Sequence, residues 1–123
     1  MLQLNGVSKR FETRVALAPL DLAVPRGEFV AILGTSGCGK STLLRIVGGL
    51  EQPSAGSVLL DGSPVTGPRP DLAFVFQEPR LMPWLTVRDN VAFGLRDRSR
   101  AERRRLAAAA LQRVGLERFG DAL

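Results

Sequence analysis

The 123-residue sequence contains no histidine and only one cysteine, Cys38. Without histidine, the chain has no imidazole to serve as a zinc ligand or as a general acid or base, and a lone thiol can neither close an internal disulfide nor build a cysteine metal site. The longest apolar stretches, such as FVAIL and LAAAAL, are far shorter than the roughly 18 residues that a membrane-spanning helix needs. The N-terminus also lacks the pattern of a secretory signal, so we expect a cytosolic protein.

Acidic residues are outnumbered by basic ones, twelve against seventeen, which gives a formal net charge of +5. Much of this excess lies in the run RDRSRAERRR, residues 96–105. Such a run can mark a nucleic-acid surface. No aromatic residues interleave the arginines, as a stacking platform would require, so we favour a solvated helix face and expect no nucleic-acid partner.

Apolar patterns predict an α/β chain with one domain over residues 1–123. Alternation around Leu2–Val7 and Leu20–Val24 predicts two antiparallel edge strands. The continuous apolar runs Phe29–Leu33 and Leu72–Phe76 are typical of strands buried on both faces of a parallel sheet. Between these runs, SVLL predicts a short strand, and Asp61-Gly62 predicts the tight turn that follows it.

Three helices are predicted from helical spacing and capping signals. The first begins near Lys40, has Leu43, Leu44 and Val47 on its apolar face, and ends at Gly48-Gly49. The second and third begin at capping-box pairs, Thr86 with Asp89 and Ser99 with Glu102. The apolar face predicted for the third helix consists of Leu106, Ala107, Ala110, Leu111 and Val114.

The segment LGTSGCGKST, residues 33–42, fits the phosphate-binding pattern G-x-x-x-x-G-K-[ST]. Its glycines permit positive φ and close approach, so successive backbone N–H groups can wrap a phosphate, and the following helix adds the positive end of its dipole. The ammonium of Lys40 can reach the β- and γ-phosphates, the Ser41 hydroxyl can ligate Mg²⁺, and Thr42 can bond an inner phosphate. The predicted ATP-binding residues of this loop are Gly34, Thr35, Ser36, Gly37, Cys38, Gly39, Lys40, Ser41 and Thr42.

Two alternatives accompany this interpretation. The loop could be a glycine-rich turn that merely caps a helix, but a chance match would not also require an apolar strand before it and an amphipathic helix after it. The Cys38 thiol could be reactive at a helix N-terminus, but no base or second cysteine accompanies it. We therefore expect its side chain to be a small filler.

From Met1 to Leu123 the sequence resembles the nucleotide-binding subunits of ABC transporters. The most specific segments are GTSGCGKST, NGVSKRF, EQPSAGSVLLDG and VFQEPRLMPWLTVRDNVAFGL, the last most similar to importers of nitrate, sulfonate and taurine. The resemblance implies a partial P-loop NTPase fold of the ABC nucleotide-binding type with an N-terminal antiparallel β subdomain. It also implies an ATP-binding subunit that couples ATP binding and hydrolysis to solute uptake through a membrane permease, as a dimer at the inner face of the membrane.

The resemblance assigns roles to further positions. Phe11 would stack on adenine, with an ordinary core phenylalanine as the alternative. Gln77 would sense the γ-phosphate through Mg²⁺ or the attacking water, a task that suits a neutral amide because it both donates and accepts hydrogen bonds. The loop Glu78–Trp84 would receive a cytoplasmic helix of the permease, anchored by Met82 and Trp84. The alternative for Trp84 is a core side chain that covers the sheet.

Members of this family continue to an LSGGQ-type signature, an apolar strand ending in Asp-Glu, and a switch histidine, none of which occurs here. The segment VLLDG imitates the acidic strand, but Gly62 stands where the glutamate would, so we interpret it as a hairpin turn. We therefore expect a truncated domain that binds ATP more readily than it hydrolyses it and whose open sheet edges invite aggregation. A small P-loop kinase with the arginine run as its lid, and a non-hydrolysing nucleotide- or partner-binding remnant, stay open as alternatives.

Overall fold

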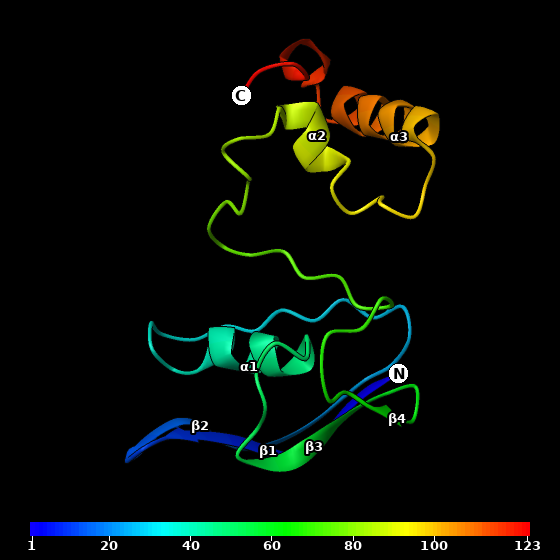
Figure 1. Cartoon of the computed structure of the whole chain (residues 1–123). Coiled ribbons are helices and arrows are strands. Elements are labelled where there is room, and N and C mark those ends of the chain that lie inside the picture. The colour runs from blue at the N-terminus through cyan, green and yellow to red at the C-terminus, as the bar shows by residue number, and fades with distance from the viewer. The chain divides into compact units, whose positions relative to one another are not determined.

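The computed structural model describes all 123 residues, which form two compact units, Met1–Val75 and Phe76–Leu123 (Figure 1). The first unit contains a four-stranded sheet and one helix, and the second contains two α-helices and a 3₁₀ turn. The single domain expected over residues 1–123 stays a prediction.

The sheet of the first unit is antiparallel throughout, with the strand order β2-β1-β3-β4. The predicted N-terminal hairpin is confirmed as β1 (Leu2–Phe11) paired with β2 (Arg14–Val24), and β3 (Ala55–Leu60) and β4 (Ser63–Pro64) complete the sheet. The prediction that both N-terminal strands are edges is wrong for β1, because β3 pairs with its free side. Only β2 and β4 lie at the edges.

An irregularity in β1 lets Leu4 and Val7 point into the same core although an odd number of positions separates them. Leu4 and Val7 are three positions apart, which would place them on opposite faces of a regular strand, yet both are fully buried. The register shifts between them, where Gly6 adopts a φ of 56°. A bulge of this kind re-aims the strand, so both side chains contribute to the core.

Helix α1 (Lys40–Val47) covers one face of this sheet (Figure 1). Leu43 and Ile46 are its buried residues, and they pack with Leu4, Val7, Val58 and Val65. Burying side chains of this size contributes roughly 1.5–3 kcal/mol each, so the cluster stabilises the first unit and anchors the helix. The predicted apolar face is therefore rotated: Ile46 belongs to it, whereas Leu44 is exposed.

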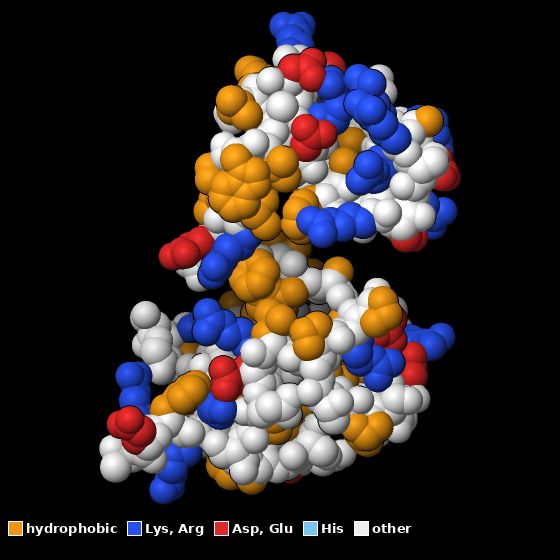
Figure 2. Space-filling model, in the orientation of Figure 1, with side chains coloured by type: hydrophobic (Ala, Val, Ile, Leu, Met, Phe, Trp, Pro, Cys, Tyr) orange, Lys and Arg blue, Asp and Glu red, His pale blue; other side chains and the backbone are white.

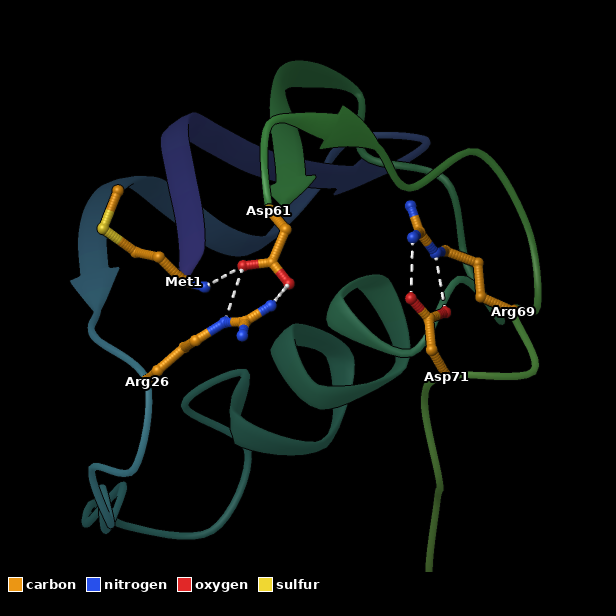
Figure 3. A network of polar contacts seen from close by, with 5 residues as sticks. All are labelled: Met1, Arg26, Asp61, Arg69 and Asp71. Carbon is orange, nitrogen blue, oxygen red and sulfur yellow. Dashed lines mark hydrogen bonds and ion pairs between the residues drawn. The ribbon is translucent and has the colours of Figure 1, made fainter.

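The predicted turn at Asp61-Gly62 is confirmed. Both residues have positive φ, 50° and 79°, as a tight hairpin of the primed type requires. The Asp61 carboxylate accepts hydrogen bonds from the amino terminus and from the Arg26 guanidinium, at 2.7 Å for Nη2 (Figure 3). These hydrogen bonds, from Arg26 above all, hold the pKa of Asp61 well below its usual range. The contacts tie the β3–β4 turn to the N-terminus and to the segment after β2.

Another ion pair of the first unit lies within the segment after β4. The guanidinium of Arg69 donates to both carboxylate oxygens of Asp71, at 2.9 and 2.7 Å (Figure 3). This fork lowers the pKa of Asp71. It shapes the chain locally, because its two members are separated by one residue.

The two apolar runs that were predicted to be buried strands form no regular secondary structure, so both predictions are wrong for this structure. Phe29, Leu33 and Val75 are 95%, 90% and 93% exposed. A strand is held by hydrogen bonds to its neighbours, and no strand pairs with residues 29–33 or 72–76. In the second run, Leu72 packs against the core, and Phe74 lies against Gly48 at the end of α1.

The second unit is built from α2 (Val87–Val91), α3 (Arg100–Arg113) and the 3₁₀ turn η1 (Glu117–Phe119). Both predicted caps are confirmed: Thr86 Oγ1 accepts from the Asp89 N–H at 3.1 Å and Ser99 Oγ accepts from the Glu102 N–H at 3.2 Å. The apolar face of α3 is narrower than predicted, with Ala107 and Leu111 buried and Val114 exposed. No helix of the chain has the length and apolar character to cross a bilayer.

Candidate functional site: a nucleotide-binding loop

The loop before α1 has the backbone pattern of an anion-binding nest. Gly37 and Gly39 have φ values of 81° and 96°, whereas Ser36, Cys38 and Lys40 have no positive φ. Positive φ at alternate residues can turn backbone N–H groups toward one side of a loop, where they can bind an anion. The Cys38 N–H of this loop donates to the Thr35 carbonyl oxygen, at 3.4 Å. Gly37 and Gly39 therefore use the positive φ that their residue type permits, and phosphate binding by the loop stays a prediction.

The first turn of α1 supplies further donors. The N–H groups of Lys40, Ser41 and Thr42 have no acceptor within the protein, and the N-cap residue Gly39 has no side chain to cap them. The first helical bond runs from the Leu43 N–H to the Gly39 carbonyl, at 2.8 Å. Unsatisfied N–H groups at the positive end of a helix dipole favour a phosphate at this position.

Gly39 and Gly34 are required for different reasons. Gly39 is left-handed, and a Cβ added there would collide with the carbonyl oxygen of Ala16 on β2. Gly34 does not have positive φ, so of the two properties expected of the loop glycines it uses only the absence of a Cβ. It permits a close approach instead, because a Cβ there would lie 2.6 Å from Cys38 Sγ.

Lys40 closes the loop on itself. Its Nζ donates to the carbonyl oxygens of Gly34 and Thr35, at 2.8 and 2.7 Å, and lies 3.3 Å from Cys38 Sγ. The Cys38 side chain lies close to Gly34 and to the Lys40 ammonium, but the residue is exposed, so its filler role stays a prediction. The Lys40 ammonium is thus held beside the first residues of the loop, where phosphate oxygens could replace the Gly34 and Thr35 carbonyl oxygens as acceptors.

The hydroxyls predicted to serve a nucleotide and its metal are available. Ser41 is exposed, Thr42 is half-buried, and neither hydroxyl makes a hydrogen bond within the protein. No three histidine, cysteine, aspartate or glutamate side chains gather to hold a metal. The donors fit Mg²⁺ that arrives with a polyphosphate, because this ion accepts a single protein oxygen together with phosphate and water oxygens.

Phe11 lies at the end of β1, where it pairs with Arg14 of β2. It is 47% exposed, so the alternative of an ordinary core phenylalanine is wrong. The Lys9 ammonium lies 4.9 Å from the centroid of the ring and is itself held by Glu51 at 2.6 Å. The ring therefore combines a fixed cation with an accessible aromatic surface.

Gln77 and the loop Glu78–Trp84 belong to the second unit, whereas the glycine loop belongs to the first. Gln77 is exposed and has no hydrogen-bonding partner in the protein, so a Mg²⁺ site shared with Ser41 stays a prediction. Trp84 is 72% exposed, which makes the alternative of a core tryptophan wrong.

Asn90 holds the backbone of this loop. Its side chain accepts from the Met82 N–H at 2.7 Å and donates to the carbonyl oxygens of Met82, Leu85 and Thr86, each at 3.1 Å. Four hydrogen bonds from one half-buried amide fix the path of the chain on both sides of Trp84. The large apolar side chain of Trp84 is thus presented to solvent from an ordered backbone.

A cavity of about 560 Å³ lies between α2 and α3 in the second unit. Trp84 and Phe93 contribute aromatic surface, and the Arg96 guanidinium lies 4.1 Å from the Phe93 ring centroid. The other arginines that line it are Arg88, Arg100, Arg103 and Arg104. Figure 2 shows the basic side chains gathered over α3.

The prediction that the whole basic run forms a solvated helix face did not include this cavity. The signal was the spacing of Arg100, Arg103 and Arg104, since residues three and four apart share one side of a helix. The sequence did not show which element that side faces.

A family model described as ABC transporter matches residues 17–123 of this chain. The chain belongs to the ABC transporter family. This ABC transporter chain is 50% identical over 125 residues to the aliphatic sulfonates import ATP-binding protein SsuB 1 of Xanthomonas axonopodis pv. citri (strain 306), covering 99% of the chain and 50% of that protein. It is 49% identical over 112 residues to SsuB of Escherichia coli (strain K12), covering 90% of the chain and 44% of that protein.

Solved structures show the same fold. The dimeric structure of a post-hydrolysis state of the ATP-binding cassette MJ0796, bound to ADP and Pi, superposes with a TM-score of 0.85 at 35% identity, covering 98% of this chain and 60% of that one. The predicted partial ABC nucleotide-binding fold with an antiparallel β subdomain is therefore confirmed. The chain spans about half the length of the curated relatives it matches. Membership of this family argues against the small-kinase alternative.

Proposed function

We propose that this chain binds ATP with Mg²⁺ as the nucleotide-binding part of an ABC importer subunit, and that the importer takes up a sulfonate or a related small anion such as nitrate or taurine. The observation that carries the proposal is the set of free N–H donors where the nest meets α1. The solute class is supported by the printed function of the SsuB relatives.

In this proposal, the nest and the first turn of α1 hold the β-phosphate, while Lys40 gives up one or more carbonyl acceptors to contact the β- and γ-phosphates. Ser41 ligates Mg²⁺, and Phe11 stacks on adenine. Stacking of a base on an aromatic side chain contributes about 1–3 kcal/mol, and it tolerates any base because every base has a π face.

The test is calorimetric titration of the whole chain with Mg²⁺ and ATP, comparing Lys40→Ala with Arg45→Ala. Arg45 lies in the last turn of the same helix, so its removal takes away an equal charge without touching the loop. A hydrogen bond to a charged group contributes about 1.5–3 kcal/mol, so Lys40→Ala should weaken ATP binding by roughly 10- to 150-fold. Absence of binding by the unaltered chain at millimolar ATP, or equal affinity of the two variants, would refute the proposal.

We also propose that the loop Glu78–Trp84, together with the arginine-lined cavity beside it, receives a cytoplasmic helix of the permease. Exposed Trp84 on a fixed backbone can act as an apolar anchor, and the arginines favour carboxylates on the incoming helix. Co-purification with the importer's detergent-solubilised permease should be lost in Trp84→Ala and kept in Phe11→Ala. Retention of the permease by Trp84→Ala would contradict this assignment.

We propose that ATP hydrolysis requires catalytic residues that this chain does not contain, and that it takes place in a dimer at the cytoplasmic face of the membrane. The support is the exposure of Phe29, Leu33 and Val75, which a parallel sheet would bury, and the share of the relatives' length that the chain spans. Phosphate release by the chain alone should stay at background, whereas enzymes have typical turnover numbers of about 1 s⁻¹ or more. Turnover at that rate by the purified chain would contradict this part of the proposal.

A further inference from the structure

We propose that Arg14 is a further nucleotide-binding residue, whose guanidinium contacts the phosphates nearest the nucleoside. This inference rests on the proposed function. It adds a second cation, contributed by the β1–β2 hairpin, to the one that the loop motif already contains.

Arg14 lies where the hairpin meets the glycine loop. It begins β2 and pairs with Phe11 across the hairpin. Its guanidinium lies beside Gly37 of the glycine loop: a Cβ added at Gly37 would be 3.8 Å from Arg14 Nη2. A residue 23 positions earlier in the sequence thus reaches the same anion-binding surface.

No carboxylate neutralises this guanidinium. Arg26, Arg69 and Arg88 each form an ion pair with an aspartate. The Arg14 side chain is exposed, and its guanidinium has neither an ion pair nor a hydrogen bond within the protein. An unpaired arginine presents a planar fork of five donors, which matches phosphate oxygens in a bidentate manner. Its place beside the nest therefore adds positive charge where the backbone already favours an anion.

The position of Arg14 indicates which phosphates it contacts. The Lys40 ammonium lies beside the first residues of the loop, where it donates hydrogen bonds to the Gly34 and Thr35 carbonyl oxygens. Arg14 lies at Gly37 and next to Phe11, the proposed adenine platform. A nucleotide that spans from Phe11 to the loop would bring its α- and β-phosphates past Arg14. Both are present in ADP as well as in ATP, so Arg14 should not distinguish the two nucleotides.

The experiment measures the affinities of the whole chain for ATP and ADP with Mg²⁺, in Arg14→Gln, Arg14→Lys and the matched control Arg10→Gln. Arg10 is an exposed arginine of β1 that also forms no ion pair. Loss of a charge-assisted phosphate contact should weaken the binding of both nucleotides about tenfold or more in Arg14→Gln. Arg14→Lys should recover part of the affinity, and Arg10→Gln should bind as the unaltered chain does.

Unchanged affinity of Arg14→Gln, or an equal loss in Arg10→Gln, would overturn the inference. A loss confined to ATP would also overturn it, because that result would place the guanidinium at the γ-phosphate. Failure of the proposed function looks different: the unaltered chain would not bind ATP, or Lys40→Ala would bind it equally well. If Lys40→Ala loses affinity and Arg14→Gln does not, only the role of Arg14 is refuted.

Discussion

The replacement Gly39→Ala tests the junction between β2, the phosphate loop and α1. Gly39 has a φ of 96°, serves as the N-cap of α1, and leaves no room for a Cβ because of the Ala16 carbonyl. The added methyl group would therefore strain the local backbone and also displace β2 from α1. Gly62→Ala is the matched control, because Gly62 has a φ of 79° with nothing near the added Cβ.

Both replacements strain a left-handed backbone, but only Gly39→Ala also forces a methyl group against neighbouring atoms. A left-handed conformation costs a non-glycine residue about 1–2 kcal/mol, and this applies to both variants. Forcing atoms into a packed site adds about 1–3 kcal/mol, and this applies to Gly39→Ala alone. We expect the free energy of unfolding to fall by roughly 2–5 kcal/mol in Gly39→Ala and by about 1–2 kcal/mol in Gly62→Ala.

Urea unfolding followed by far-ultraviolet circular dichroism measures both values, since the sheet and α1 belong to the first unit. ATP titration supplies a second measurement: Gly39→Ala should weaken binding because it moves the N–H donors, and Gly62→Ala should not. Equal destabilisation by the two replacements would refute the role of the Ala16 contact. Unaltered ATP affinity in Gly39→Ala would refute the link between this junction and the nest.

Two further predictions concern polar side chains. Asn90→Ala removes the amide that holds the Met82 and Leu85 backbone, so it should lower the free energy of unfolding of the second unit by about 1–3 kcal/mol. Trp84 fluorescence in urea measures this loss, and an unshifted unfolding midpoint would show that the Asn90 hydrogen bonds do not stabilise the unit. The Arg26 hydrogen bond lowers the pKa of Asp61 in the folded chain below the unfolded value of about 4. The contribution of the Asp61 carboxylate to folding stability is therefore fully present above pH 4 and is lost as the pH falls below about 4 toward the folded pKa. The stability difference between the unaltered chain and Asp61→Asn, a replacement that tolerates the left-handed turn, should therefore shrink from pH 6 to pH 3, and a constant difference would show that the carboxylate charge does not contribute.

Local sequence patterns predicted the structure correctly where it depends on a few neighbouring residues. The Asp61-Gly62 turn and the caps at Thr86 and Ser99 form as expected, because the backbone conformation or a hydrogen bond three residues away determines each. The strand predictions for Phe29–Leu33 and Leu72–Phe76 are wrong, because a strand requires partners that its own sequence does not supply. Helical spacing also placed Leu44 on the wrong side of α1, since the sheet selects which side is buried.

The sequence by itself therefore determined the family and the chemistry of the glycine loop, because the spacing of glycine, lysine and hydroxyl residues carries the N–H donors and the cation within ten positions. Only the tertiary structure brought Arg14 to Gly37 and set the arginines of α3 around a cavity. Those neighbours are separated along the chain or belong to different elements. Their contact depends on how strands pair and helices pack, which local patterns do not specify.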